Sequence, residues 1–191
     1  MSRRNTGMGG WFWLLAGIGA GVVASWVGER RVFVGEHPLE GRIAQGERIS
    51  KAVIGFSDMH ESQLEGAQLP GAVIGLINLE EASFHSADLN HAIFGLSNCE
   101  EVTFTSADLN GAVFGLCNLE EADFSQARLR GAIFDACNLR DATFEGADMT
   151  GAQMKNCQYE GVTLPDGESW SPTTDWARFT ETGHPQYWRA G

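Results

Sequence analysis

The feature that most constrains this chain is an uninterrupted five-residue repeat that runs from Ala52 to Asp166. In each five, a large apolar residue recurs at a fixed central position and the residue two places before it is small, as in Ala87-Asp88-Leu89 and Ala92-Ile93-Phe94. A period of five fits neither the 3.6 residues of a helical turn nor the two-residue alternation of a strand. The repeat itself therefore sets the architecture.

A second period of twenty residues lies on top of the first. Phenylalanine recurs at this spacing in two series, which are Phe84, Phe104, Phe124 and Phe144, and Phe94, Phe114 and Phe134. Twenty residues per turn means four fives per coil, one for each side of a square tube. Coils would stack roughly 4.8 Å apart, the spacing of hydrogen-bonded strands, with like side chains above one another inside.

The triplets Ala87-Asp88-Leu89, Ala107-Asp108-Leu109 and Ala147-Asp148-Met149 resemble the central motif of the pentapeptide-repeat family. The resemblance implies an all-β fold, a right-handed quadrilateral β-helix. It implies no single function, because that fold serves many roles. Some acidic members of the family resemble DNA in shape and charge and bind DNA gyrase, which gives this chain one alternative function.

We expect five segments in chain order. They are an N-terminal tail (1–10), a transmembrane helix (11–27), a linker with an N-terminal cap (28–51), the β-helix (52–166) and an aromatic-rich C-terminal cap or tail (167–191). In the linker, Val32-Phe33-Val34 and Arg42-Ile43-Ala44 look extended and are expected to cover the strand edges of the first coil. After the tube, Ser171-Pro172 can begin a short helix. The aromatic end is expected to be a lid over the last coil, a docking tail, or both.

The run from Trp11 to Val27 carries no charge. As a helix it would be about 26 Å long, enough to span a hydrocarbon core of roughly 30 Å with snorkelling ends. It predicts a single-pass membrane anchor in the lipid bilayer; the alternative is a cleaved export signal, although no clean Ala-x-Ala site follows. The short basic tail before it favours a cytoplasmic N-terminus, with the β-helix on the periplasmic or lumenal side.

Small residues recur every four positions along this predicted helix. The candidate helix–helix contact face consists of Ala16, Gly17, Ala20, Gly21, Ala24 and Ser25. Small residues on one face let a second helix approach closely in lipid. The partner of such a face would be another membrane helix; the alternative is a helix that is merely rich in glycine.

One outer face of the predicted tube is apolar. Its residues stand just before or two after the centre of every fourth five, and they are Val53, Phe56, Val73, Leu76, Ile93, Leu96, Val113, Leu116 and Ile133. This ladder would be about 24 Å tall at strand spacing, and a patch of this extent usually marks an interface. We predict a docking face for a partner, a second copy or lipid; the alternative is that β-branched residues here merely favour the strand backbone.

The neighbouring face is acidic. Its stacked residues are Glu80, Glu81, Glu100, Glu101, Glu120 and Glu121, beside an asparagine column of Asn78, Asn98, Asn118 and Asn138. Like charges stacked at this spacing repel, so solvent, cations or a basic partner must offset them, and the asparagines are expected to form a hydrogen-bond ladder. The net charge of −12, with 18 acidic and four basic residues in the array, disfavours nucleic acid as a partner.

Residues suited to catalysis are scarce. Cys117, Cys137 and Cys157 recur every twenty residues at the small inward position and Cys99 at a central one, which indicates buried filler, and His60, His85 and His91 fall on different faces. No catalytic, cofactor or metal residues are predicted, and the chain is not expected to be an enzyme. We predict a membrane-anchored scaffold subunit that docks onto a larger membrane protein complex, photosynthetic or respiratory; the alternatives are gyrase binding and a homodimer.

Overall fold

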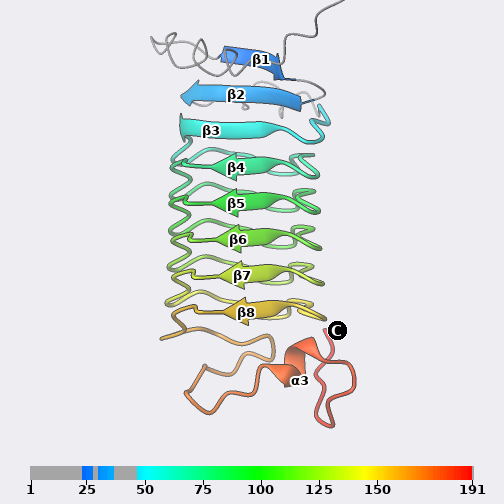
Figure 1. Cartoon of the computed structure of the whole chain (residues 1–191). Coiled ribbons are helices and arrows are strands. Elements are labelled where there is room, and N and C mark those ends of the chain that lie inside the picture. Colours follow the sequence, from blue (N-terminus) through cyan, green and yellow to red (C-terminus); the bar gives the residue numbers. More distant parts are fainter. Residues whose placement is uncertain (1–22, 28–29, 37–46, 191) are drawn as a thin grey trace, which may run out of the picture.

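The computed structural model describes residues 23–27, 30–36 and 47–190. Figure 1 shows one tall stack of coils that ends in a small irregular region. The elements are β1 (Val23–Val27), β2 (Arg30–Glu36), β3 (Val53–Asp58), β4 (Val73–Gly75), β5 (Ile93–Gly95), β6 (Val113–Gly115), β7 (Ile133–Asp135), β8 (Gln153–Lys155) and α3 (Ala177–Thr180). The eight strands form one sheet in chain order.

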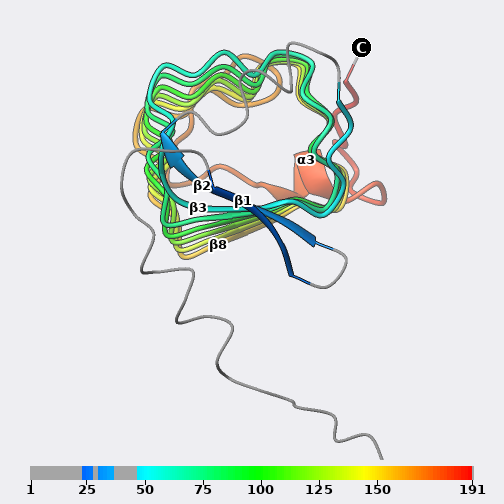
Figure 2. The ribbon, with the colours of Figure 1, turned by 90° about the horizontal axis from the view of Figure 1, so that it is seen from above.

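The coils are held together by pairing between residues twenty apart. Strands β3 to β8 are parallel, and Ile74 of β4, for example, pairs with Phe94 of β5. Single bridges repeat the same offset on the other three sides, as between Asn78 and Asn98. Seen along its axis, the tube has a four-cornered outline (Figure 2). The predicted all-β parallel solenoid is therefore confirmed.

Two phenylalanine columns fill the interior. Within one column the rings of Phe94 and Phe114 stack with centroids 4.8 Å apart and planes 10° apart. Across the tube, Phe104 of the other column meets Phe114 edge-on at 5.7 Å and 70°. Both arrangements suit the charge distribution of aromatic rings. The twenty-residue period thus places each ring between the ends of the columns in contact with rings of the coils above and below.

The corners of the tube use a left-handed backbone. From Phe56 to Gly161, the residue two places after each central position has a positive φ, which is 50° at Phe56 and 76° at Gly161. Glycine adopts this conformation without penalty, whereas a side chain makes it costly. A bulky apolar residue at a corner therefore needs a reason other than backbone preference.

The prediction of a transmembrane helix over 11–27 is wrong at its C-terminal end. Residues Val23–Val27 form β1, which pairs antiparallel with β2, while residues 11–22 lie outside the described part of the chain. Strand β2 pairs with β3 on one side, and β1 covers its other edge, which satisfies backbone groups that a helix would leave exposed on β2. Apolar composition alone does not reveal that a strand edge is available.

The two described residues of the predicted helix–helix contact face lie in a strand and not in a helix. Ala24 and Ser25 lie in β1, opposite Phe33 and Val32 of β2, and the other four residues of that face lie outside the described residues. In the described ranges, no helix combines the length and apolarity needed to cross a bilayer. The extended conformation predicted for Val32-Phe33-Val34 is confirmed in β2; the second predicted segment, 42–44, is not among the described residues.

The C-terminal aromatic residues close the lower end of the tube. Phe179, on the single helical turn α3, is buried. The rings of Trp176 and Trp188 lie 6.3 Å and 6.1 Å from its ring. The amide of Gly151 in the last coils donates to the Thr180 carbonyl oxygen at 2.7 Å. This geometry supports the interpretation as a lid, and a docking role for the tail stays a prediction.

The helix expected at Ser171-Pro172 begins later in the chain, at Ala177. Instead, the Thr174 amide donates to the Ser171 carbonyl oxygen, and the Ser171 amide donates to the Thr174 hydroxyl, both at 2.9 Å. These two bonds close a turn, because a threonine hydroxyl three residues on competes for the groups that would start a helix.

Replacing Phe114 by alanine is expected to lower the free energy of unfolding by about 3–5 kcal/mol, because the stacked column loses a fully buried ring. The control is Leu116→Ala on the same coil, where the exposed side chain is removed and the change should stay within about 0.5 kcal/mol. Urea unfolding followed by circular dichroism measures both. Equal losses would contradict the assignment of the rings as the core.

Candidate functional site

The apolar face lies on the outer side of the sheet, over β3 to β7. The large hydrophobic side chains that are exposed in the described part of the chain all lie here: Phe56 (63%), Leu76 (50%), Ile93 (45%), Leu96 (60%) and Leu116 (61%). The other predicted members of the face are half-buried between them, and they are Val53, Val73, Val113 and Ile133. The twenty-residue register thus gathers all nine residues on one side.

Four of these residues occupy left-handed corners. They are Phe56, Leu76, Leu96 and Leu116, with φ between 50° and 56°. A residue with a side chain costs about 1–2 kcal/mol in this conformation. On the other three sides, the described corners of the array carry glycine or polar residues, such as Gly66, Ser106 and Glu121. Neither the core nor the backbone calls for leucine at an exposed corner, so its role lies at the surface.

Glycines between the two apolar columns keep the face flat. A Cβ atom at Gly55 or Gly75 would approach the carbonyl oxygen of the next coil within 3.0 Å and 3.3 Å. At Gly95 the nearest such atom is 4.0 Å away, and at Gly115 no atom lies within 4 Å. Packing therefore explains the first two glycines, whereas the last two are small in a position that has room for a side chain.

The acidic ladder stands beside an ordered asparagine column. From Asn98 onward, each asparagine amide donates to the asparagine oxygen of the preceding coil, at 3.2 Å for Asn98, 3.1 Å for Asn118 and 2.9 Å for Asn138. The same amides donate to Glu80, Glu100 and Glu120 at 3.1, 3.2 and 2.8 Å. The predicted hydrogen-bond ladder is confirmed. The ladder also offsets part of the repulsion between stacked carboxylates, since Glu80, Glu100 and Glu120 each accept a hydrogen bond from an asparagine amide.

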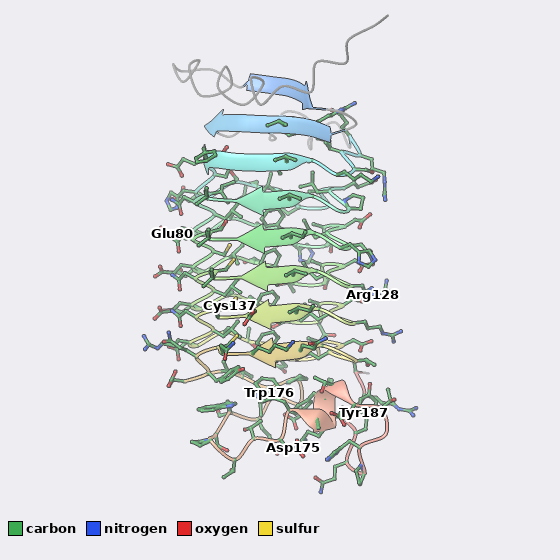
Figure 3. All side chains as sticks on the ribbon, viewed as in Figure 1. Glu80, Arg128, Cys137, Asp175, Trp176 and Tyr187 are labelled. Carbon is green, nitrogen blue, oxygen red and sulfur yellow. The ribbon has the colours of Figure 1, made fainter. Side chains whose placement is uncertain are left out.

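The apolar face and the acidic ladder meet along one edge of the tube. Along a single coil, Leu96 is followed two residues later by Asn98 and then by Glu100 and Glu101. Figure 3 shows Glu80 at this edge of the strand face and Arg128 at the opposite edge. The outer glutamates Glu81, Glu101 and Glu121 are exposed. A molecule that covers the apolar face therefore meets negative charge along one side.

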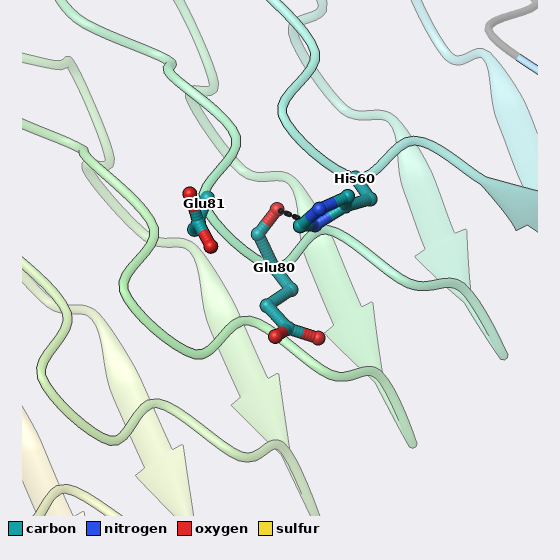
Figure 4. Close-up of side chains that lie close together, drawn as sticks. All are labelled: His60, Glu80 and Glu81. Atoms are coloured by element: carbon teal, nitrogen blue, oxygen red, sulfur yellow. Dashed lines mark hydrogen bonds between the residues drawn. The ribbon is translucent and has the colours of Figure 1, made fainter.

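A histidine stands at the top of the acidic ladder. His60 lies one coil above Glu80, and its Nδ1 atom donates to the Glu80 carbonyl oxygen at 3.1 Å (Figure 4). Its Nε2 atom lies 3.1 Å from Oε1 of Glu61. Partial burial would lower the pKa of the imidazole, but the hydrogen bond to Glu80 and the carboxylates of Glu61, Glu81 and Glu80 outweigh it and raise the pKa.

This cluster is not apparent from the sequence when each histidine is assigned to its own face of the tube. One nitrogen of His60 and one carboxylate oxygen each of Glu80 and Glu81 lie within 4.8 Å of one another. The signal was available in the twenty-residue period, which places residue 60 above residue 80. His85 and His91 lie on other sides of the tube, as expected.

The cysteines line one inner corner as free thiols. Cys99, Cys117 and Cys137 are buried, and Cys157 is half-buried. The thiol of Cys137 donates to the Phe114 carbonyl oxygen at 3.4 Å. Its contact with the Cys117 thiol, together with burial, raises the pKa of Cys137 to about 11. A thiol with a raised pKa is a poor nucleophile near neutral pH, which agrees with a packing role.

The sequence matches known repeats over most of the tube. Residues 57–95 match the family described as pentapeptide repeats (8 copies), and residues 97–168 match the one described as pentapeptide repeat region. The chain belongs to the pentapeptide-repeat family. Members of this family are generally non-catalytic structural or binding proteins. No curated protein matches the sequence.

Several solved pentapeptide-repeat structures are similar to this chain. A protein from the Arabidopsis thaliana thylakoid lumen is 18% identical, with a TM-score of 0.42, over 57% of this chain and 69% of that one. HetL, involved in heterocyst differentiation regulation in the cyanobacterium Nostoc, is 25% identical, with a TM-score of 0.34, over 64% and 67%. QnrB1, a plasmid-mediated fluoroquinolone resistance protein, is 17% identical, with a TM-score of 0.31, over 69% and 78%.

The buried thiols predict a loss of stability in alkaline solution. An unfolded thiol has its ordinary pKa of 9.0, and Cys137 in the tube titrates at about 11. As pH rises through this window, the unfolded chain releases its proton first, so the free energy of unfolding should fall. Urea midpoints at about pH 7.5 and about pH 10.5 measure the loss.

The double variant Cys117→Ala/Cys137→Ala provides the control, since alanine occupies the small inward position elsewhere in the array. Its alkaline loss should be clearly smaller than that of the natural protein. An equal loss in both proteins would show that other groups cause the effect.

Proposed function

We propose that this pentapeptide-repeat protein is a non-catalytic scaffold that binds a protein partner through its apolar face. The partner would present an apolar stripe with a row of basic side chains along one side. The observation that carries the proposal is the series of exposed apolar corners at Phe56, Leu76, Leu96 and Leu116. These corners lower the stability of the free chain through their left-handed backbone, so their benefit is expected in a complex.

The energy available at this face is sufficient for specific binding. Fully burying a leucine or phenylalanine side chain is worth about 1.5–3 kcal/mol, and the four corner residues are half to two-thirds exposed. Each would therefore contribute roughly 1 kcal/mol or more when covered. The small residues Gly95 and Gly115 between the columns allow a partner surface to approach the backbone closely.

The charge next to the face favours a different protein over a second copy. The exposed outer glutamates Glu81, Glu101 and Glu121 run along one edge, and the chain carries a net charge of −12. Two copies repel each other at long range, whereas a basic partner is attracted and oriented. Gyrase binding by DNA mimicry, the alternative suggested by the family, would use the charge and leave the apolar face without a role.

Membrane anchoring and a periplasmic or lumenal position were predicted from a helix over 11–27. Because Val23–Val27 form a strand, we do not include the anchor in the proposal. For the same reason we do not specify a membrane complex as the partner. We specify only the chemistry of the partner, which is a protein surface that is apolar with one basic edge.

The first test places glutamate at two apolar corners, Leu96→Glu and Leu116→Glu. A photo-crosslinking phenylalanine analogue in place of Leu96 should first attach a distinct protein in native extracts, which mass spectrometry identifies. That protein, once purified, should bind the double variant at least about tenfold more weakly in calorimetry, because interface anchors are each worth more than about 1 kcal/mol.

The matched control is Ser86→Glu with Ser106→Glu. These serines occupy the same exposed left-handed corners, one coil apart, on another side of the tube. They should leave the affinity unchanged, and the crosslinker in place of Ser86 should give no product. Crosslinking of a second copy or of lipid at the Leu96 position, or equal binding by both double variants, would overturn the proposal.

The acidic edge predicts salt-sensitive association. Glu101→Gln combined with Glu121→Gln should slow the association rate of the identified partner at low salt and flatten its dependence on salt, since complementary charges steer encounter. Glu65→Gln with Glu145→Gln removes the same charge from another side and should have a smaller effect. Surface plasmon resonance at two salt concentrations measures both pairs; similar behaviour would show that only the net charge matters.

A further inference from the structure

The cluster at the top of the acidic ladder has the donor set of a metal site. It combines one imidazole with the carboxylates of Glu61, Glu80 and Glu81, all on the outside of two successive coils. Nitrogen and carboxylate oxygen together are ligands of Zn²⁺ and similar borderline cations. Figure 4 shows His60 reaching down from its own coil to the backbone of Glu80.

The hydrogen bonds orient the imidazole for coordination. Since Nδ1 donates its proton to the Glu80 carbonyl oxygen, the lone pair of the neutral ring is on Nε2. A backbone carbonyl that fixes the tautomer in this way is the usual outer-shell partner of a metal-binding histidine. Nε2 lies 3.1 Å from Oε1 of Glu61. In the protonated ring this contact is an ion pair, and in the neutral ring a cation between the two atoms can take the place of that proton.

The spacing of these two atoms fits a shared ion. With bonds of about 2.0–2.2 Å, two ligand atoms of a tetrahedral Zn²⁺ are roughly 3.3 Å apart. The Nε2 to Oε1 distance of 3.1 Å is close to this value. One nitrogen of His60 and one oxygen each of Glu80 and Glu81 lie within 4.8 Å of one another, so the two glutamate side chains need a shift of about 1.5 Å to reach bonding range.

An outer-shell contact also prepares one of the carboxylates. The Asn98 amide donates to Oε2 of Glu80 at 3.1 Å, which leaves Oε1 of that carboxylate for a cation. The same contact recurs at Glu100 and Glu120, but the coils below have no histidine in the position of His60. The repeat thus offers comparable carboxylates without a nitrogen donor.

We propose that His60, Glu61, Glu80 and Glu81 form a binding site for one divalent cation of the zinc class. Three carboxylates around a dication leave a small negative charge, so the ion would relieve the repulsion where the ladder begins. The site is independent of the apolar face: a failure of the docking proposal leaves it standing, and its own failure leaves the docking proposal standing.

The test is a titration of the full-length, untagged, chelator-treated protein with ZnCl₂ in a calorimeter. One ion should bind per chain. His60→Ala and Glu81→Gln should each weaken binding by at least about tenfold, because even outer-shell changes cost 10–100-fold. Co²⁺ in place of Zn²⁺ should give the visible absorption of a tetrahedral centre, which His60→Ala abolishes. Mg²⁺ should not compete, since it demands octahedral oxygen ligands.

Two matched variants separate a site from general attraction to the acidic face. Glu101→Gln removes the equivalent carboxylate one coil below Glu81, and His85→Ala removes an exposed histidine from another side. Both should retain the affinity of the natural protein. Weak uptake of several ions that is the same in the natural protein and in His60→Ala would overturn the proposal, as would the absence of binding.

Discussion

The tube depends on backbone hydrogen bonds between neighbouring coils, which stack residues that are twenty apart in the sequence. The Leu89 amide donates to the Asp108 carbonyl oxygen at 2.9 Å, and the Phe84 amide donates to the Thr103 carbonyl oxygen at 2.7 Å, so each bond joins an amide to the carbonyl nineteen residues later. Because the offset never changes, like residues stack upon like residues. Inside, this stacking gives continuous aromatic columns; outside, it gives columns of leucine, asparagine and glutamate. The surface is therefore as regular as the core, and its composition can be interpreted column by column.

The fold and most of its faces could be predicted from the sequence, because a strict period carries three-dimensional information without any alignment. The central residue of each five, such as Phe114, had to point inward, and its neighbours Val113 and Leu116 had to point outward. The asparagine ladder followed from the same rule. The period does not reach beyond the array, so the ends were predicted less well. Apolar residues suggested a helix where Val23–Val27 extend the sheet, and Ser171 suggested a helix where a turn forms.

Backbone geometry distinguishes surface residues that look equivalent in the sequence. From sequence, Leu96 is one apolar residue among many; in the structure it is exposed and left-handed, a combination with an energetic cost and no benefit within the chain. The histidine cluster shows a different limit. Its members were visible singly, but their association depends on the hydrogen bond from His60 to the Glu80 backbone, and side-chain orientation of this kind cannot be deduced from a period.

The four-sided coil also determines how such a chain can change its length. Adding or removing twenty residues inserts or deletes one whole coil, and each column of side chains continues on the same side of the tube. Adding five residues instead turns everything downstream by a quarter of a revolution and moves the leucines under the glutamates, and removing five turns it the opposite way; either change breaks the asparagine column. Growth in units of one coil is therefore compatible with a working surface, whereas growth by a single motif is not, even though each motif fits the interior equally well.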